Sequence, residues 1–314
     1  MIRRIQNKVA ESRYTLPVTV LYGCAVWAAA GLFSRQWWIQ FCCFIASAYL
    51  MMELNNRNML IRIFSRTVSC SYIVLTCIAI SFFLSISGAV TQLAVIASLL
   101  LLFQSYQDKE AAGHIFYAFL CLGLGCMADI RLICYLPLYW GLTAWTLYSL
   151  SWRTGAASLL GLLTPYWFSL AWHMYQGKGD ISQWLSFFSG FHDIVWPPDY
   201  TVIGQSELVL ILFLVTLALL GAVHFVLTSY HDKIRVRQIY YSFILTVVWS
   251  LFITAMQPQC FDVTCRMMII SVSPLIAHFI ALTHTRLSNI VFFALLAASL
   301  ILTCYFLWIS SSVS

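Results

Sequence analysis

Residues 207–229 read ELVLILFLVTLALLGAVHFVLTS, a run with a single charged residue, Glu207, at its start. A bilayer core about 30 Å thick needs about 20 apolar residues per helix, so this run is long enough to cross a membrane. The following residues, 230–237, read YHDKIRVR and are rich in charge. The chain of 314 residues repeats this alternation, with 61% hydrophobic and 9% charged residues. The pattern predicts an all-α membrane protein and excludes a water-soluble globule.

Apolar runs of this kind follow one another along the whole chain. We predict about 11 transmembrane helices in a single polytopic domain covering residues 1–314. The N-terminal segment is polar and basic, and two apolar runs follow it in succession, which favours an uncleaved first span over a removed signal peptide. The expected spans are residues 17–34, 37–54, 67–85, 88–105, 113–128, 131–150, 155–175, 207–229, 239–256, 266–283 and 289–309.

Lysine and arginine are distributed unevenly among the expected loops. Short loops rich in these cations stay on the cytoplasmic side of a membrane. The alternation therefore predicts an N-terminus inside and a C-terminus outside. It also explains the net charge of +6, so we expect no nucleic acid as a partner. Membrane lipids are the expected partners of the basic loops. Of the 17 cations, the four expected on the outer side are Arg35, Arg131, Lys178 and Arg266.

The longest expected loop, residues 176–206, has an amphipathic segment of its own. Apolar residues recur in it at helical spacing, with serine and glutamine between them, which predicts a short helix lying in the membrane interface. The pair Pro197 and Pro198 would end that helix, because proline cannot continue it. The apolar residues of this segment are Ile181, Trp184, Leu185, Phe188, Phe191 and Val195.

Acid–base pairs stand at the outer ends of the expected spans. Asp129 is close in sequence to Arg131, and Asp262 is close to Arg266. A carboxylate can act as a general base on an acceptor hydroxyl, and an arginine can bind the phosphate of a lipid carrier through its planar fork. We predict Asp129, Asp262 and Asp193 as candidate catalytic acids, and Arg131 and Arg266 as candidate binders of lipid phosphate. The alternative is that these charges are solvated caps or topological anchors.

The sequence predicts neither a metal site nor a cofactor. Eleven cysteines occur without a C-x-x-C pair, which argues against zinc and thioredoxin-type sites. Cys260 and Cys265 would form a disulfide only if their loop faces an oxidising compartment. Four loop residues with metal-binding side chains match no known ligand spacing. These residues are His192, Asp193, Asp199 and Glu207.

Few polar residues fall inside the expected spans. His278 and Gln92 are the main ones, and an ionisable residue within a membrane is a functional candidate. A neutral histidine bonded to a neighbouring helix is the simpler interpretation of His278. Pro137, Pro165 and Pro274 are also expected inside spans, where each would kink its helix.

Several segments resemble an uncharacterised family of polytopic inner-membrane proteins of the Bacteroidota. The resemblance implies a bacterial inner (cytoplasmic) membrane location. Its general layout is similar to GT-C-type glycosyltransferases and O-antigen polymerases, which use polyprenyl-linked sugars on the outer leaflet. The segments that carry the resemblance are residues 58–83, residues 112–148, Trp152-Arg153, residues 160–166 (LGLLTPY) and residues 269–279 (IISVSPLIAHF).

The resemblance to GT-C enzymes has one clear departure. Those enzymes usually carry an acidic catalytic residue in the first external loop, whereas this chain has Ser34-Arg35-Gln36 there. No catalytic residue can be carried over, so an acid would have to come from the three aspartates predicted above. The first hypothesis is a glycosyltransferase-like envelope protein that handles polyprenyl-phosphate-linked or other lipid-linked glycans. The alternatives are a non-catalytic assembly factor or scaffold of an envelope complex, and a transporter or flippase.

Overall fold

The computed structural model describes residues 5–176 and 198–312, and within these ranges the chain is helical and has no β-strand. The prediction of an all-α protein is therefore confirmed. The expected interfacial helix falls mostly on residues 177–197, which lie outside the described residues, as does Asp193.

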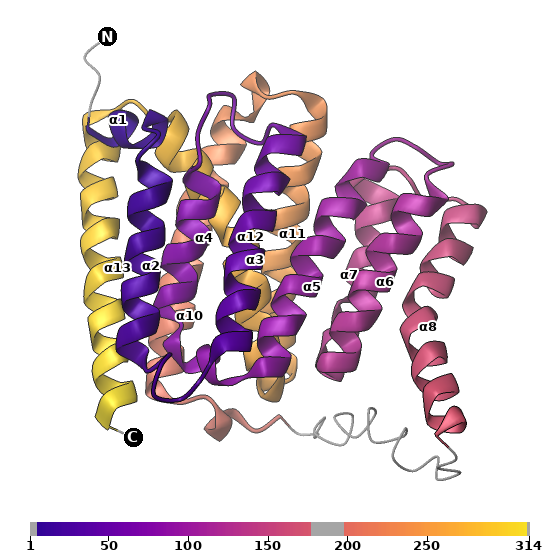
Figure 1. Ribbon diagram of the computed structural model, residues 1–314. Helices are drawn as coiled ribbons and strands as arrows, with labels where there is room; N and C mark the ends of the chain where they lie inside the picture. The colour runs from indigo at the N-terminus through magenta and orange to yellow at the C-terminus, as the bar shows by residue number, and fades with distance from the viewer. Residues whose placement is uncertain (1–4, 177–197, 313–314) are drawn as a thin grey trace. The chain divides into compact units, whose positions relative to one another are not determined.

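Each of the eleven expected spans coincides with a helical segment of the structure (Figure 1). Several segments combine an α-helix with a short 3₁₀ turn, and the sixth consists of a 3₁₀ turn, a short α-helix and a π-helical turn. The α-helices of the described residues are α1 (Ile5–Glu11), α2 (Thr15–Ala30), α3 (Trp38–Asn58), α4 (Thr67–Ile78), α5 (Ile86–Leu102), α6 (Ala112–Ala128), α7 (Leu136–Gly141), α8 (Trp152–Tyr175), α10 (Gln205–Thr228), α11 (Ile234–Met256), α12 (Phe261–Leu282) and α13 (Arg286–Ser312).

Five helical segments of the described chain are long and apolar enough to cross a membrane. Such a set of helices is that of a multi-pass membrane protein, because a soluble fold rarely contains even one such segment. The exact number of eleven spans, and their orientation, stay predictions. The five segments are Ile86–Ser105, Gln205–His231, Ile234–Met256, Pro258–Leu282 and Arg286–Ser310.

Proline behaves differently at the three expected positions. Pro165 lies inside α8 and Pro274 inside α12, as predicted. Pro137 lies in the first turn of α7, after the 3₁₀ turn Ile130–Tyr135. The expected kink at Pro137 was wrong, because a proline in the first turn lacks only an N–H that would have no helical partner.

The tenth span begins earlier than its hydropathy suggests. The helix α12 starts at Phe261, directly after the short 3₁₀ turn Pro258–Cys260, whereas the expected span started at residue 266. Asp262 and Arg266 therefore lie one turn apart on a helix, and not in a loop. Pro258 and Asp262 are well suited to a helix start, because proline fits a first turn and an acid interacts favourably with the helix dipole.

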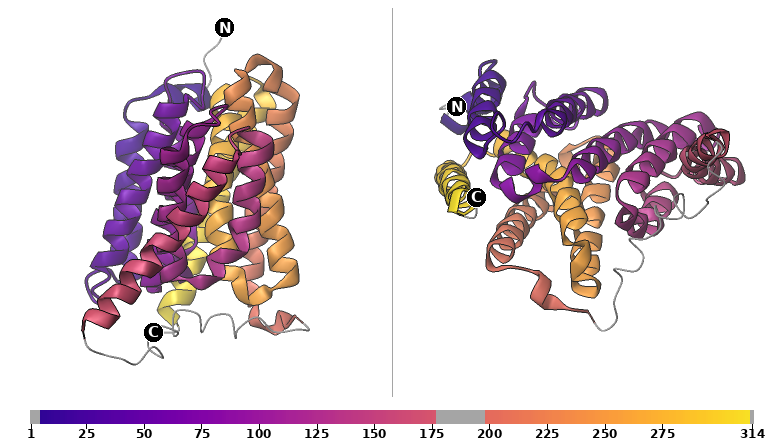
Figure 2. Two further views of the ribbon diagram at one scale, coloured as in Figure 1. Left: turned by 90° about the vertical axis from the view of Figure 1, so that its right-hand side faces the viewer. Right: turned by 60° about the horizontal axis from the view of Figure 1, so that its bottom comes forward.

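Backbone contacts divide the described chain into two compact units, and the expectation of one domain stays a prediction. Unit 1 comprises Met1–Ile86, Gly204–Val247 and Met268–Ser314, and unit 2 comprises Ser87–Ile203 and Val248–Met267. The helices of each unit run lengthwise beside one another (Figures 1 and 2). Because α5, α11 and α12 cross the unit boundaries, each of these helices contributes residues to both units.

In unit 1 the helix α4 packs against α2, α3 and α13. The Trp27 ring stacks on Phe83 with a centroid distance of 3.8 Å, and such stacking adds to the area burial of both rings. The helices α10 and α12 approach closely at Gly221, where a Cβ atom would lie 2.7 Å from the backbone of Leu275. Small residues of this kind allow membrane helices to pack backbone to backbone.

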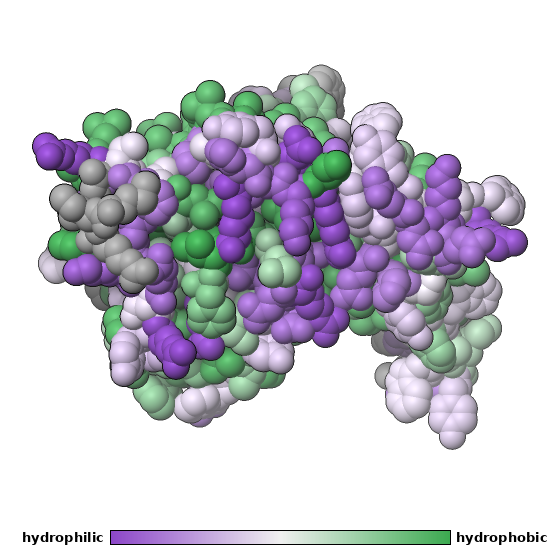
Figure 3. Space-filling model, turned by 90° about the horizontal axis from the view of Figure 1, so that it is seen from above, coloured by the Kyte–Doolittle hydropathy of each residue, from purple (hydrophilic) through white to green (hydrophobic). Residues whose placement is uncertain are grey.

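One end of unit 1 is polar and basic. The Gln6 side chain donates to the Ile280 carbonyl at 2.7 Å, and Ser65 donates to the Ala10 carbonyl at 2.7 Å. Together with the bond from the Asn7 side chain to the Thr283 carbonyl at 3.1 Å, these bonds bring the N-terminal helix α1 to the connection between α3 and α4 and to the connection between α12 and α13. Figure 3 looks down on the end at which α1 lies and shows hydrophilic residues gathered there. The region between α10 and α11 joins these segments, because Arg62 donates to Asp232 and Arg235 donates to Asn58. The cations of all these regions and of the adjoining helix ends are Lys8, Arg57, Arg62, Arg66, Lys233, Arg235 and Arg286.

In unit 2 the helices α6 and α8 form the most extensive helix pair. Two glycines permit their close approach. A Cβ atom at Gly161 would lie 2.3 Å from the Phe116 carbonyl oxygen, and one at Gly123 would lie 2.6 Å from the Leu162 carbonyl oxygen. Helix α8 begins with a capping box in which Ser151 and Thr154 satisfy each other's backbone N–H groups.

Candidate functional site

Four of the five residues predicted from the sequence lie at one end of unit 2, in a group that we call the Arg266 cluster (Asp129, Arg131, Asp262, Arg266 and Gln92). Asp129 follows the last residue of α6, and its carboxylate accepts a hydrogen bond from the Arg131 backbone N–H at 3.0 Å. The Arg131 guanidinium donates to the Gln259 carbonyl at 3.2 Å. Three separate elements, α5, the α6–α7 connection and α12, therefore supply the cluster.

Arg266 is the buried centre of this cluster. Its Nε donates to the Asp262 carboxylate at 3.0 Å, and its Nη1 donates to the Gln92 side-chain oxygen at 3.1 Å. Its side chain is 5% exposed, whereas that of Asp262 is 29% exposed. Gly88 makes room for the guanidinium, because a Cβ atom there would lie 2.4 Å from Arg266 Nη2. The ion pair of Asp262 with Arg266 is thus completed by an amide from α5.

Asp129 is half-buried and lies within electrostatic reach of the charges around it. Burial raises the pKa of its carboxyl group above the ordinary value. The Arg131 backbone N–H and guanidinium oppose this rise in pKa, the Asp262 carboxylate adds to it, and Arg266 opposes it. A carboxyl group with a raised pKa is a better proton acceptor at neutral pH, so Asp129 is the member of the cluster best suited to act as a general base.

An arginine that binds a phosphate group must be accessible, and the two arginines of the cluster differ in accessibility. Arg266 is closed to a lipid phosphate in this conformation, because its guanidinium is buried against Asp262 and Gln92. Arg131 also donates to the Gln259 carbonyl, but its side chain is partly exposed. Sequence reasoning missed the part that Gln92 and Gly88 play here. A polar residue in the middle of an apolar run was the signal for Gln92.

The cysteines near this cluster form no disulfide in the structure. Cys260 and Cys265 are both buried free thiols, and the described chain has no disulfide. The conditional disulfide between Cys260 and Cys265 is therefore absent, because the first lies in the 3₁₀ turn and the second lies five residues on, inside α12.

A second polar group, of which the sequence analysis singled out only His278, lies in unit 1. We call it the Asp232 cluster (Arg62, Asp232, His278 and His224). Asp232 lies between α10 and α11 and accepts a hydrogen bond from Arg62 Nε at 2.5 Å. Its second carboxylate oxygen is 3.3 Å from His278 Nε2, and His278 Nδ1 is 3.3 Å from His224 Nδ1. Here the acid is buried, with its side chain 1% exposed, whereas the side chain of Arg62 is 37% exposed.

The Asp232 cluster stabilises a charged carboxylate. Burial opposes the charged form, but the hydrogen bonds from His278 and Arg62 outweigh burial and lower the pKa of Asp232 to about 2. His278 is fully buried, and the Tyr240 and Phe225 rings pack against its imidazole edge-on. The prediction of a histidine bonded to a neighbouring helix agrees with this placement. The acid and the arginine escaped detection because 170 residues separate them in the chain.

Within the described ranges, no three His, Cys, Asp or Glu side chains are arranged so that they could hold a metal ion. No family model, curated protein or solved structure matches this chain. The function therefore has to be inferred from the two clusters themselves.

Proposed function

We propose that this chain is an integral membrane protein of the bacterial cell envelope that binds a polyprenyl-phosphate-linked or other lipid-linked glycan at the Arg266 cluster. The observation that carries the proposal is the meeting of Asp129, Arg131, Asp262 and Arg266 at one end of unit 2. A partly exposed arginine beside a half-buried carboxyl group provides a phosphate binder and a proton acceptor side by side.

In the glycosyltransferase-like form of the proposal, Arg131 binds the phosphate of the lipid carrier. The acceptor hydroxyl transfers its proton to the Asp129 carboxylate, and its oxygen attacks the anomeric carbon as the bond to the carrier phosphate breaks. The carrier phosphate leaves with the bonding electron pair. Asp262 and Arg266 act as positioning residues, because their ion pair holds the start of α12 beside Asp129.

The proposed location is the inner membrane, with eleven spans, the N-terminus inside and the C-terminus outside. In unit 1, the N-terminal segment and the connections after α3, α10 and α12 share the basic end. In unit 2, Ser151 donates to the Lys109 carbonyl at 2.8 Å, so two further cation-bearing connections share an end. This grouping supports the orientation, because cytoplasmic loops carry the excess of lysine and arginine.

The proposal is tested with the full-length protein in nanodiscs that contain undecaprenyl phosphate. We expect the wild type to retain this lipid and Arg131→Ala to lose at least a factor of ten in affinity, since a bidentate arginine contact is lost. Arg35→Ala, which removes a cation from an expected outer loop elsewhere in the chain, is the matched control and should bind like the wild type. Equal binding by the wild type and Arg131→Ala would refute the proposal.

A scaffold of an envelope complex is the second candidate function. The observation that favours it is the saturation of Arg266 by Asp262 and Gln92, which is typical of an arginine with a structural task. The growth or glycan phenotype of two variants distinguishes these two functions. An enzyme loses function in Asp129→Asn and Arg131→Ala while the protein stays folded, whereas a scaffold tolerates both substitutions and fails only when its fold or partner surface is disturbed.

A further inference from the structure

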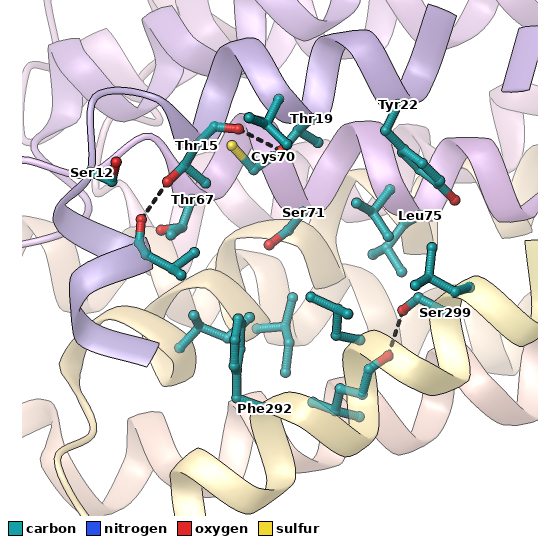
Figure 4. Close-up of a pocket in the computed structure, with 18 of the residues that line it drawn as sticks. Ser12, Thr15, Thr19, Tyr22, Thr67, Cys70, Ser71, Leu75, Phe292 and Ser299 are labelled. Atoms are coloured by element: carbon teal, nitrogen blue, oxygen red, sulfur yellow. Dashed lines mark hydrogen bonds between the residues drawn. The ribbon is translucent and has the colours of Figure 1, made fainter. Parts of the chain in front are cut away.

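A groove of about 640 Å³ lies in unit 1, apart from both clusters. The helices α2, α4 and α13 form its walls, and α1 lies at one end (Figure 4). Its volume falls within the range of about 300–1,000 Å³ that is typical of ligand sites. Thr15 and Thr67 lie near the α1 end in Figure 4, and Leu75 and Phe292 lie further along the helices.

The walls of the groove present hydrocarbon in spite of their hydroxyl groups. Thr19 donates to the Thr15 carbonyl at 2.7 Å, and Ser299 donates to the Leu295 carbonyl at 2.7 Å. Tyr22 shares a hydrogen bond of 2.7 Å with Thr303. Because these hydroxyls already bond to the protein's own helices, they do not need a hydrogen bond from a molecule in the groove. An apolar chain is therefore an occupant that leaves the bonds of these three hydroxyls intact.

The groove has an apolar rim and a cationic end. Val18 on α2 and Leu296 and Leu300 on α13 line it and are 64%, 46% and 45% exposed. In a membrane protein such exposed apolar residues face lipid tails. Of the described residues that line the groove, Lys8 alone is charged, and it lies on α1 at the polar end of unit 1.

We propose that this groove is a binding site for an anionic phospholipid, with one acyl chain between α2 and α13 and the headgroup at Lys8. The hydrocarbon walls select a chain, and the single cation at the end selects a negative headgroup. The segment of α13 from Phe292 to Leu300 rises roughly 12 Å, which is enough for a large part of an acyl chain. This inference does not depend on the proposed function of the Arg266 cluster.

The test uses the full-length protein in mild detergent, titrated with phosphatidylglycerol or phosphatidylcholine of equal chain length, with bound lipid counted by native mass spectrometry. Val18→Trp fills the groove from its exposed rim, and Leu296→Trp fills it from the opposite wall. Val20→Trp is the matched control, since Val20 lies on the same helix, is exposed and does not line the groove. We expect a retained phosphatidylglycerol in the wild type and Val20→Trp, and at least tenfold weaker retention in both groove variants.

The headgroup is tested by charge reversal. Lys8→Glu should reduce the preference for phosphatidylglycerol by about fivefold or more, since one cation near a membrane surface contributes about 1 kcal/mol. Arg13→Glu makes the same change in net charge on an exposed residue outside the groove and should keep the preference. The proposal is overturned if the wild type retains no lipid, if Val18→Trp binds like Val20→Trp, or if both charge reversals lower the preference equally.

Discussion

The two arginine–aspartate clusters bury opposite partners. In unit 2 the arginine is buried and the aspartate partly exposed, whereas in unit 1 the aspartate is buried and the arginine partly exposed. Arginine cannot give up its proton in a protein, so a buried arginine always needs a counter-charge. A buried aspartate can become neutral by taking up a proton. Arg266 therefore depends on its partner more strongly than Asp232 does.

The surroundings of the two buried groups also differ. Arg266 is held by the Asp262 carboxylate on its own helix and by the Gln92 amide on α5. Asp232 is held by Arg62 from the α3–α4 connection and by the His278 imidazole on α12. The ion pair of the first cluster lies within one helix, whereas that of the second joins two segments far apart in the chain.

The largest effect is expected for Asp262→Ala. It leaves Arg266 buried and charged without its carboxylate partner, and removal of one member of a buried ion pair costs about 3–5 kcal/mol. The unfolding midpoint in detergent should fall steeply at constant pH. The double variant Asp262→Ala with Arg266→Met should recover most of the loss, because no buried charge remains. A stable Asp262→Ala protein would show that the pair contributes little.

A smaller loss is expected for Arg62→Ala. Asp232 keeps His278 as a partner and can be protonated, so the cost at pH 7 should be about 2 kcal/mol, the value of a hydrogen bond to a charged group. In the wild type the pKa of Asp232 is about 2 and lies below the unfolded value of about 3.9. The stability that this shift contributes is present above pH 4 and is lost as the pH falls toward 2.

The difference in stability between the wild type and Arg62→Ala should therefore be constant above about pH 4 and shrink below it. Thermal unfolding of both proteins across this range measures it. Arg57→Ala is a suitable control, because Arg57 is exposed and pairs with Glu53 on its own helix. A loss in Arg62→Ala as large as that in Asp262→Ala would contradict the contrast between the clusters.

Gly88→Ala tests the packing around Arg266. The added methyl group would collide with the guanidinium, and overpacking of this kind costs about 1–3 kcal/mol. Gly155→Ala is the matched control on α8, where the new Cβ would meet no atom within 4 Å. That control should be neutral or stabilising by up to about 1 kcal/mol, since alanine favours a helix. Equal behaviour of the two variants would mean that Arg266 moves aside freely.

The smallest effect on stability is expected for Asp129→Asn. Asparagine can still accept the hydrogen bond from the Arg131 N–H. Because burial raises the pKa of Asp129, the folded wild type takes up a proton at higher pH than the unfolded chain does. Wild-type stability should therefore improve relative to Asp129→Asn as the pH is lowered through that pKa. A difference that does not change with pH would rule out a raised pKa.

Hydropathy located the helices well, because an apolar run is recognised from neighbouring residues alone and needs no knowledge of distant contacts. The eleven apolar runs, including residues 207–229, all coincide with helical segments. It failed at the start of α12, where Asp262 and Arg266 are polar by themselves but neutralise each other one turn apart. The same limitation hid the role of Pro137, since an apolar run does not show where its α-helix begins.

Four residues of the candidate site could be predicted from the sequence, but the way they are arranged in space could not. Asp129, Arg131, Asp262 and Arg266 stood out as charges at span ends, whereas the burial of Arg266 depended on Gln92, which is 174 residues away in the chain. The pairing of Arg62 with Asp232 likewise depends on a contact between α10–α11 and α3–α4 connections. Such contacts leave no periodic signal in a single sequence.

The order of amino acids alone determined that the protein is helical and built for a membrane, because every apolar run must find a hydrocarbon environment wherever the chain folds. Tertiary structure alone decided which charge of each pair is buried, and it created the groove between α2 and α13. The physical reason is that burial and pairing are properties of neighbours in space, and those neighbours come from distant parts of the chain.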